Sequence, residues 1–261
     1  MSDKERTTQA GAGLADIVDF CDGLLRPGDI EDYKGAVNGL QVENDGSVTR
    51  IGAAVDASLN VISRAAEDKV DLLIVHHGLF WTPRVPWTGA TMEIARQVIG
   101  SNMALYSSHL PLDVHPEIGN NVLLCEALGL VDPKPCARLN GLLTGMASNA
   151  ILPIAELAKR LQNAVGGPVN LLPCGPETTT SIAVVTGGAG SEVAALAAEG
   201  FDTFITGEGP HWSYGLAQEL RINVLYAGHY ATETFGVKAL ASLLADRFRI
   251  PWTFIDDPSR L

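Results

Sequence analysis

Apolar and polar residues occur along this chain in blocks that have the lengths of strands and helices. Short apolar runs rich in β-branched and aromatic residues predict buried strands at residues 51–55, 71–75, 103–106, 142–146, 169–172, 182–185, 203–206 and 222–226. Longer segments with apolar residues at helical spacing predict helices at residues 14–25, 59–68, 92–99, 117–128, 153–165, 191–199 and 233–244. Because strands and helices alternate, the pattern predicts an α/β fold with largely parallel strands.

The two halves of the chain resemble each other. Residues 51–81 align with residues 182–212 without a gap, and residues 105–113 align with residues 225–233. The second alignment matches a histidine and, four positions later, an acid: His109 with His229, and Asp113 with Glu233. We therefore predict two related α/β lobes in a pseudo-twofold arrangement, formed by residues 1–137 and 138–261, with a metal site in the cleft between them.

Metal-type ligands gather after the predicted strands. The six histidines all lie in loops that follow predicted strands: His76, His77, His109, His115, His211 and His229. The ends of parallel strands lie along one edge of a sheet, so we expect three strand ends to bring histidines and carboxylates together. Imidazole suits zinc, iron or manganese, and carboxylates can bridge two ions, whereas calcium prefers oxygen ligands alone. The pattern therefore predicts a site for two divalent metal ions.

Other residues near the predicted site have alternative roles. His109 precedes Leu-Pro-Leu and is expected to bond a ligand or contact substrate. Glu208 aligns with His77 and fits a base, a ligand, a partner of a ligand histidine, or a plain turn residue. His211 is a candidate for proton transfer, and Trp81 either stacks on a heterocycle or packs at the rim. The glycine-rich segment 187–190 fits a phosphate-binding turn or tight packing equally well.

Composition excludes several classes of protein. A chain of 261 residues with 46% hydrophobic and 18% charged residues is typical of a globular protein. The net charge of −12 argues against binding to nucleic acid phosphates. No apolar stretch approaches the roughly 20 residues that span a bilayer, so we expect no membrane partner. The first 13 residues lack an apolar core, and the four cysteines form no C-x-x-C pair, so we expect a cytoplasmic protein.

Four motifs together resemble a known family. They are His-His-Gly-Leu-Phe-Trp at 76–81, His-Leu-Pro-Leu-Asp-x-His-Pro-Glu-Ile-Gly-Asn-Asn at 109–121, Thr-Gly-Glu at 206–208 and Gly-His-Tyr-Ala-Thr-Glu at 228–233. This combination resembles the NIF-three-like dinuclear metal-centre proteins, often labelled GTP cyclohydrolase I type 2 homologues. The resemblance covers nearly the whole chain and fits the short bacterial form, which lacks the extra domain that some members carry.

The resemblance implies a set of metal ligands and an assembly. The ligands fall on His76, His77, Asp113, His229 and Glu233. Glu233 would bridge the two ions, with one imidazole of the His76–His77 pair on each side. The family also implies a ring-shaped homohexamer whose sites face an internal cavity.

Our functional interpretation is a metal-dependent hydrolase with a small-molecule substrate. The substrate would be a nucleotide, as in a GTP cyclohydrolase, or a phosphoester, and proton transfer would fall to Glu208, His109 or His211. The alternative is a non-enzymatic metal-binding oligomer that acts as a scaffold for protein partners. The sequence alone assigns no catalytic residue.

Overall fold

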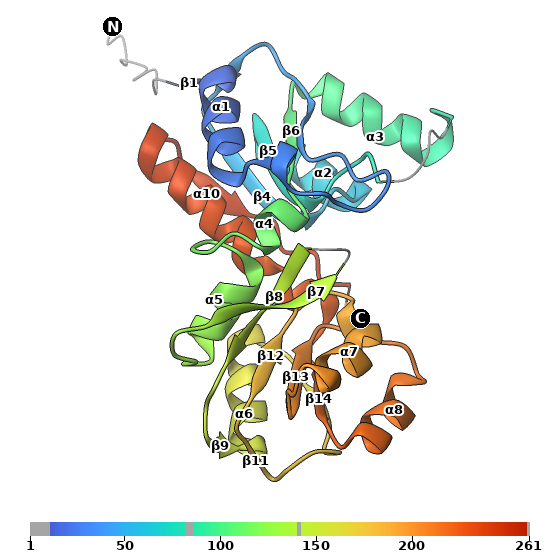
Figure 1. Cartoon of the computed structure of the whole chain (residues 1–261). Coiled ribbons are helices and arrows are strands. Elements are labelled where there is room, and N and C mark those ends of the chain that lie inside the picture. The colour runs from blue at the N-terminus through green and yellow to red at the C-terminus, as the bar shows by residue number, and fades with distance from the viewer. Residues whose placement is uncertain (1–10, 82–85, 140–141, 260–261) are drawn as a thin grey trace, which may run out of the picture. The chain divides into compact units, whose positions relative to one another are not determined.

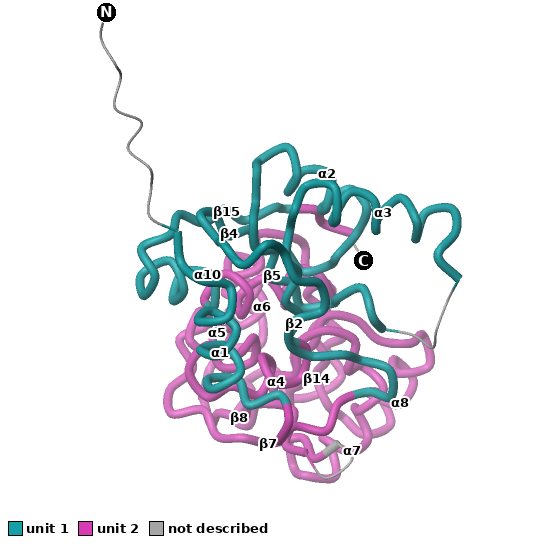
Figure 2. Tube along the Cα trace, turned by 90° about the horizontal axis from the view of Figure 1, so that it is seen from above, with its two compact units in different colours: residues 1–27, 33–108, 240–256 teal, residues 28–32, 109–239, 257–261 magenta. Residues whose placement is uncertain are grey.

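The computed structural model describes residues 11–81, 86–139 and 142–259. It contains two compact units (Figure 2). Unit 1 comprises residues 1–27, 33–108 and 240–256, and unit 2 comprises residues 28–32, 109–239 and 257–261. The lobe boundary between residues 137 and 138 stays a prediction. Most of the polar N-terminal segment lies outside the described residues.

Unit 1 is built on a five-stranded sheet with the order β15-β4-β5-β6-β2. Figure 1 labels its strands β4, β5 and β6. Its strands are β15 (Trp252–Phe254), β4 (Ile51–Asp56), β5 (Leu72–His77), β6 (Ala104–Ser107) and β2 (Gly39–Val42). The first four are parallel, and β2 pairs with β6 in the antiparallel sense. Strands β4 and β5 are buried along nearly their whole length, as expected for parallel strands covered on both faces. The short strands β1 (Ala12–Gly13) and β3 (Ser47–Val48) form a separate ribbon.

Helices of unit 1 pack against this sheet. They are α1 (Leu14–Leu25), α2 (Leu59–Glu67) and α3 (Gly89–Gly100), together with the end of α10 (Thr234–Phe248). Ser58 caps α2 by accepting a hydrogen bond from Val61 N at 3.1 Å. Ile62 of α2 and Val98 of α3 are buried in one apolar cluster with strand residues such as Leu73. Helices α1 and α10 meet edge to face through Phe20 and Phe248, whose ring centroids are 6.0 Å apart.

Unit 2 contains a six-stranded sheet with the order β10-β14-β13-β12-β8-β7. Its strands are β10 (Asn170–Leu172), β14 (Asn223–Tyr226), β13 (Thr203–Thr206), β12 (Ile182–Val184), β8 (Leu142–Ser148) and β7 (Lys134–Leu139). The three central strands β12, β13 and β14 are parallel, and the outer three pair in the antiparallel sense. Strands β9 (Leu152–Pro153) and β11 (Thr178–Thr179) form a second small ribbon.

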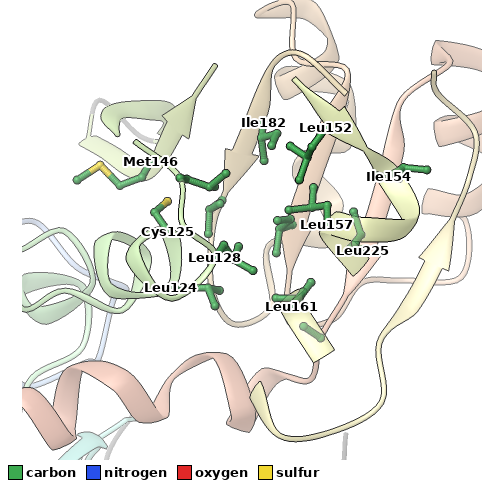
Figure 3. Close-up of a cluster of buried hydrophobic side chains, with 14 residues drawn as sticks. Leu124, Cys125, Leu128, Met146, Leu152, Ile154, Leu157, Leu161, Ile182 and Leu225 are labelled. Carbon is green, nitrogen blue, oxygen red and sulfur yellow. The ribbon is translucent and has the colours of Figure 1, made fainter. Parts of the chain in front are cut away.

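Two apolar clusters cover the sheet of unit 2. Its helices are α4 (Leu110–Asp113), α5 (Asn120–Ala127), α6 (Ile154–Val165), α7 (Val193–Ala198), α8 (Ser213–Leu220), α9 (His229–Thr232) and the start of α10, and the short 3-10 helices are η1 (Pro27–Asp29), shared with unit 1, and η2 (Ala189–Glu192). Figure 3 shows Leu124 of α5 and Leu157 of α6 buried with Ile182 of β12. Helices α7 and α8 contribute Leu196 and Ala217 to the other cluster. None of the helices within the described ranges has the length and apolar composition needed to cross a membrane.

The two sheets repeat one arrangement of strands. In unit 1 Ile51 of β4 pairs with Leu72 of β5, and in unit 2 Ile182 of β12 pairs with Thr203 of β13. These are the positions that the alignment of residues 51–81 with 182–212 matches. The edge strands β2 and β10 also correspond, because each pairs antiparallel with the last parallel strand of its sheet. The predicted internal relationship between the two halves therefore appears in the strand ladders.

Matching aspartates close the same turn in both units. Asp71 Oδ2 accepts hydrogen bonds from Thr49 N at 2.6 Å and from Thr49 Oγ1 at 2.7 Å. Asp202 Oδ2 accepts them from Thr180 N at 2.8 Å and from Thr180 Oγ1 at 2.7 Å. Burial alone would raise the pKa of Asp202, but hydrogen bonds from neighbouring threonines lower it. The sequence alignment matches Asp71 with Asp202, and the structure shows that the two aspartates make equivalent hydrogen bonds in their turns.

Several sequence-based predictions need correction. The alignment of residues 105–113 with 225–233 pairs Tyr106 with Tyr226, but the ladders match Ser107 with Tyr226. The strand ladders therefore place β6 and β14 one residue away from the register of the sequence alignment. The loop between β14 and His229 is one residue longer than the loop between β6 and His109, which restores the match at the histidines. Strand β7 and helices α4 and α8 were not predicted, because β7 lies in a proline-containing segment and the two helices are short. Pro153 lies in β9 and caps α6 instead of beginning it.

Candidate metal centre

In unit 1 a pair of histidines ends the central strand of the sheet. His76 and His77 are the last two residues of β5, so the prediction that they lie in the following loop is wrong. The strand continues through them because Asp56, at the end of β4, still pairs with His77. Neighbouring residues of a regular strand point to opposite faces. Here the two imidazole centroids are only 4.8 Å apart, so the rings lie side by side.

Hydrogen bonds fix the orientation of both rings. Nδ1 of His76, which is fully buried, lies 2.9 Å from the backbone oxygen of Ser108, and Nδ1 of His77 lies 2.8 Å from Asp56 Oδ1. A carbonyl or carboxylate oxygen can only accept, so each ring donates from Nδ1. In the neutral ring the lone pair is then on Nε2, the nitrogen that can bind a cation. The ring of Trp81 packs edge-on against His77 with 5.2 Å between centroids.

In unit 2 the carboxylate of Asp113 is held by buried amides and hydroxyls. Asp113 ends the short helix α4 and is 7% exposed. Asn120 Nδ2 donates to Asp113 Oδ1 at 2.8 Å, and Thr186 Oγ1 lies 3.5 Å from the same oxygen. Asn121 holds Thr186 in turn, because its Oδ1 accepts from Thr186 N at 2.8 Å. Hydrogen bonds from Asn120 and Thr186 therefore fix the orientation of the Asp113 carboxylate.

A second cluster in unit 2 joins a histidine to two glutamates. His229 is the first residue of α9, and Glu233 follows that helix as its C-cap, so the prediction that Glu233 begins the last helix is wrong. His229 Nε2 lies 3.2 Å from Glu233 Oε1, and its Nδ1 lies 2.8 Å from Glu208 Oε1. Two atoms that both bind zinc at about 2.0–2.2 Å can be at most about 4.4 Å apart, so the first pair fits one shared cation.

The electrostatics of this cluster favour a positive charge. The hydrogen bond to Glu233 and the charges of Glu233 and Glu208 raise the pKa of His229 to about 9, although burial alone would lower it. Glu233 itself is 3% exposed. The buried Glu233 carboxylate thus helps to keep a proton on His229. A divalent cation bound between the two side chains could replace that proton.

The glycine-rich segment serves to pack the strand ends. Gly187 has φ +72°, and a Cβ atom there would collide with Glu233 Oε1. The backbone N–H groups of Gly187, Ala189 and Gly190 donate to Thr232 Oγ1, Thr206 Oγ1 and Glu208 O at 3.0, 3.2 and 3.0 Å. These donors already have protein acceptors, so the structure favours tight packing over the phosphate-binding turn.

A further histidine is paired with an aspartate that the sequence reasoning did not consider. His109 Nδ1 lies 2.8 Å from Asp32 Oδ1, and the two side chains are only 8% and 6% exposed. The other oxygen of Asp32 accepts from Leu110 N at 3.2 Å, at the start of α4. His115, by contrast, accepts from the N–H groups of Glu117 and Ile118 at 3.2 Å each, so its ring caps this loop. His211 lies in the turn before α8.

Supporting residues were the part of the site that sequence reasoning missed. Asp32, Asp56, Ser108 and Thr186 contact the predicted residues, but they belong to no recognisable motif of the sequence. Asn120 and Asn121 stand in the motif that carried the family resemblance, which was the one available signal. Histidine and glutamate side chains among the described residues could hold a metal ion.

Comparison with known proteins finds relatives along the whole length of the chain. The model of the Duf34/NIF3 (NGG1p interacting factor 3) family matches residues 12–259. A GTP cyclohydrolase 1 type 2 homolog of Deinococcus radiodurans is 37% identical over 263 aligned positions, which cover 100% of this chain and 99% of that protein. The protein of the same name from Pyrococcus abyssi is 39% identical over 94% of this chain and 98% of its own length.

Solved structures show the same fold. The crystal structure of TTHA1606 from Thermus thermophilus superposes with a TM-score of 0.87 at 38% identity, covering 95% of this chain and all of that chain. A protein named ybgI, of unknown function, gives the same TM-score at 32% identity. The α/β architecture, the motifs around the histidines and these full-length similarities lead to one conclusion: the chain belongs to the Duf34/NIF3 family.

Proposed function

We propose that this protein binds two divalent metal ions and is a metal-dependent hydrolase. The ligands would be His76, His77, Asp113, His229 and Glu233, with Glu233 shared by both ions. Imidazole and carboxylate together suit zinc, iron or manganese. The substrate would be a nucleotide, in keeping with the name of the curated relatives, or a phosphoester.

One observation carries this proposal: the ligand histidines are all oriented in the way that metal ligands usually are. Nδ1 of His76, His77 and His229 lies 2.8–2.9 Å from a carbonyl or carboxylate oxygen. Metal-binding histidines characteristically donate their second ring N–H to such an acceptor, which fixes the ring and makes it a better ligand. Surface histidines without a role need no such set of partners.

The chain's own residues divide the remaining work. When bound, a pair of metal ions lowers the pKa of water and polarises a substrate oxygen. Asn120 and Thr186 hold the Asp113 carboxylate, and Glu208 orients His229. The hydrogen bond to His229 makes Glu208 a partner of a ligand more than a free base, although the sequence left both roles open.

The deciding experiment combines metal content with a screen for turnover. Protein loaded with zinc, manganese or iron should carry close to two ions per chain by elemental analysis and should hydrolyse GTP or p-nitrophenyl phosphoesters. Glu233→Gln should lose the paired ions and the turnover while the protein still folds, which a cooperative thermal transition would show. One ion or none after reloading would contradict the dinuclear site.

The same experiment separates the alternative function. A protein with two bound ions and no turnover on any nucleotide or phosphoester would favour a metal-binding scaffold for protein partners. We also propose a cytoplasmic homohexamer. Light scattering at micromolar concentration tests the assembly, and a monomer would contradict it.

A further inference from the structure

Unit 1 contains an apolar cavity that the proposed metal site does not use. Its volume is about 670 Å³, and pockets for small molecules have volumes of roughly 300–1,000 Å³. Residues from three segments form most of its wall: the segment 35–42, the segment 78–80 and helix α3. The segment 78–80 belongs to the motif that begins with the two histidines at 76 and 77, but it holds no candidate metal ligand. This part of the motif therefore contributes to the cavity.

Helix α3 faces the cavity with its apolar side. Thr91, Ile94, Ala95 and Val98 follow one another at helical spacing, and all four line the cavity. Val98 is the only residue of this 12-residue helix that is fully buried, and Ile94 and Ala95 are half-buried. A surface helix ordinarily buries a whole apolar stripe against the core. The stripe of α3 thus leaves room for a further apolar group.

Another wall of the cavity is held in place by Gln41. Its Nε2 donates to Val37 O at 2.6 Å, and its Oε1 accepts from Leu79 N at 2.7 Å and from Phe80 N at 3.3 Å. Val37 N also donates to Phe80 O at 3.2 Å. Gly78 leaves room for the glutamine, because a Cβ atom there would collide with the Gln41 amide. The chain itself fixes this wall, as is usual for a small-molecule site.

The cavity extends from the surface of unit 1 to its apolar core. Val98 is 1% exposed and belongs to the cluster of buried residues beneath α2 and α3. Four other lining residues are large, apolar and at least 38% exposed: Val37, Phe80, Trp87 and Ile99. A molecule that enters between these exposed side chains would therefore reach the core and exchange water for apolar contacts.

The lining side chains disfavour a polar ligand. Among the described residues that line the cavity none is charged, and Thr91 Oγ1 and Trp87 Nε1 are the only polar side-chain atoms. A nucleotide base has several donors and acceptors along its edges, and most of them would lose their hydrogen bonds with water here. A hydrocarbon group has none to lose, and each methylene group that leaves water favours binding. The cavity therefore suits a hydrocarbon better than the base of a nucleotide.

We propose that this cavity binds the hydrocarbon chain of a small amphipathic molecule and leaves the polar head group in water at the opening. The proposal is independent of the proposed hydrolase, because no lining residue is a proposed metal ligand. The net charge of −12 opposes an anionic head group, so uncharged primary alkanols are suitable probes.

Calorimetric titration with 1-hexanol, 1-octanol and 1-decanol tests the proposal on the wild-type protein as purified. One alkanol should bind per chain. Each added methylene group should raise the affinity by about fourfold for as long as the chain fits the cavity.

Two alanines of α3 provide a matched pair of variants. Ala95→Phe puts an aromatic ring into the cavity and should weaken octanol binding by about tenfold or more, the equivalent of two methylene groups. Ala90 is exposed on the same helix and does not line the cavity, so Ala90→Phe should bind octanol like the wild type. Equal affinities of the two variants for octanol would overturn the proposal.

A photoreactive octanol locates the site in the wild type without any variant. On illumination, 3-azioctanol attaches to residues that it touches, and mass spectrometry of peptides identifies them. We expect label on α3 or on the segments 35–42 and 78–80, and an excess of 1-octanol should suppress it. Label confined to other parts of the chain would overturn the proposal even if Ala95→Phe failed to fold.

The remaining outcomes distinguish other occupants of the cavity. A wild type that binds no alkanol would overturn the proposal. If Ala95→Phe then also changed the mass measured by light scattering, the cavity would belong to a contact between copies of this chain. None of these measurements depends on metal content or turnover, so this proposal and the proposed function can fail separately.

Discussion

Asn120 binds Asp113 with one end of its amide and the start of the last helix with the other. Its Nδ2 donates to Asp113 Oδ1 at 2.8 Å, and its Oδ1 accepts from Gly236 N at 2.7 Å. The side chain is fully buried. Gly236 follows Glu233 by one helical turn, so a single amide connects the segments that carry both acidic ligands of the proposed metal site.

Asn120→Ala should therefore weaken folding and metal binding together. The change leaves a buried acceptor and a buried donor without their partner, and each costs about 1–3 kcal/mol. Loss of the residue that orients a ligand should reduce metal affinity by about 10–100-fold. Asn163→Ala, at an exposed position of α6, is the control and should change stability by no more than about 0.5 kcal/mol. Wild-type metal affinity in Asn120→Ala would show that Asp113 needs no support from this amide.

Gly187→Ala should disturb the site beyond its effect on the backbone. Gly187 and Gly166 both have a left-handed conformation, with φ +72° and +68°. An alanine in this region costs about 1–2 kcal/mol at either position. The added Cβ atom meets Glu233 Oε1 at Gly187 but meets no atom within 4 Å at Gly166. Both variants should lower the melting temperature, and only Gly187→Ala should also lower metal content. Equal metal content in the two proteins would mean that Glu233 can move aside.

Asp56→Asn should reduce metal affinity without changing the fold. The carbonyl of the new amide can still accept from His77 Nδ1, but the charge that strengthens the imidazole as a ligand is lost. Calorimetric titration with zinc should show weaker binding, by about 10-fold or more, at the low end of the range for such partners. Asp19→Asn removes the same charge from an exposed position and should bind zinc like the wild type. Equal affinities in both variants would assign Asp56 to the strand ladder alone.

The strands were predictable because their apolar runs are dense and short. Residues 203–206 are β13 as predicted, and helix 14–25 is α1 with the same bounds. Prediction failed where polar residues or proline lie within a strand that the surrounding sheet stabilises. His76 and His77 are polar residues inside a strand, and hydropathy ends the strand before them, although ladder pairing with β4 carries it on. Strand β7 has a proline and charged residues, yet it lies at the edge of its sheet, where proline is tolerated.

The proposed ligands were recognisable, but the residues that support them were not. A histidine with an acid four positions later is visible in one sequence. Asp32 and His109 are far apart in the chain, and only the fold brings them within 2.8 Å. The register between Tyr106 and Tyr226 illustrates the same limit. The identical residue types Tyr106 and Tyr226 suggested one alignment of the two halves. The hydrogen bonds between strands instead match Ser107 with Tyr226, one residue further along.

The stability of the metal-free protein should depend on pH through His229. Glu233 and Glu208 raise the pKa of His229 to about 9 in the folded chain, whereas a histidine in an unfolded chain titrates near 6.5. Because the folded pKa is the higher one, the stabilisation is fully present below about pH 6.5 and is lost as the pH rises through about 9.

His229→Asn removes this titration, so the comparison isolates it. With a chelator present, the melting temperature of the wild type minus that of His229→Asn should be largest near pH 6 and should shrink above pH 9. Saturating zinc should reverse the trend, because the cation competes with the proton and its stabilisation of the wild type grows with pH. A difference in melting temperature that stays constant from pH 6 to pH 10 in the chelated protein would show that the two glutamates do not hold a proton on His229, and the shared cation inferred between His229 and Glu233 would lose its electrostatic basis.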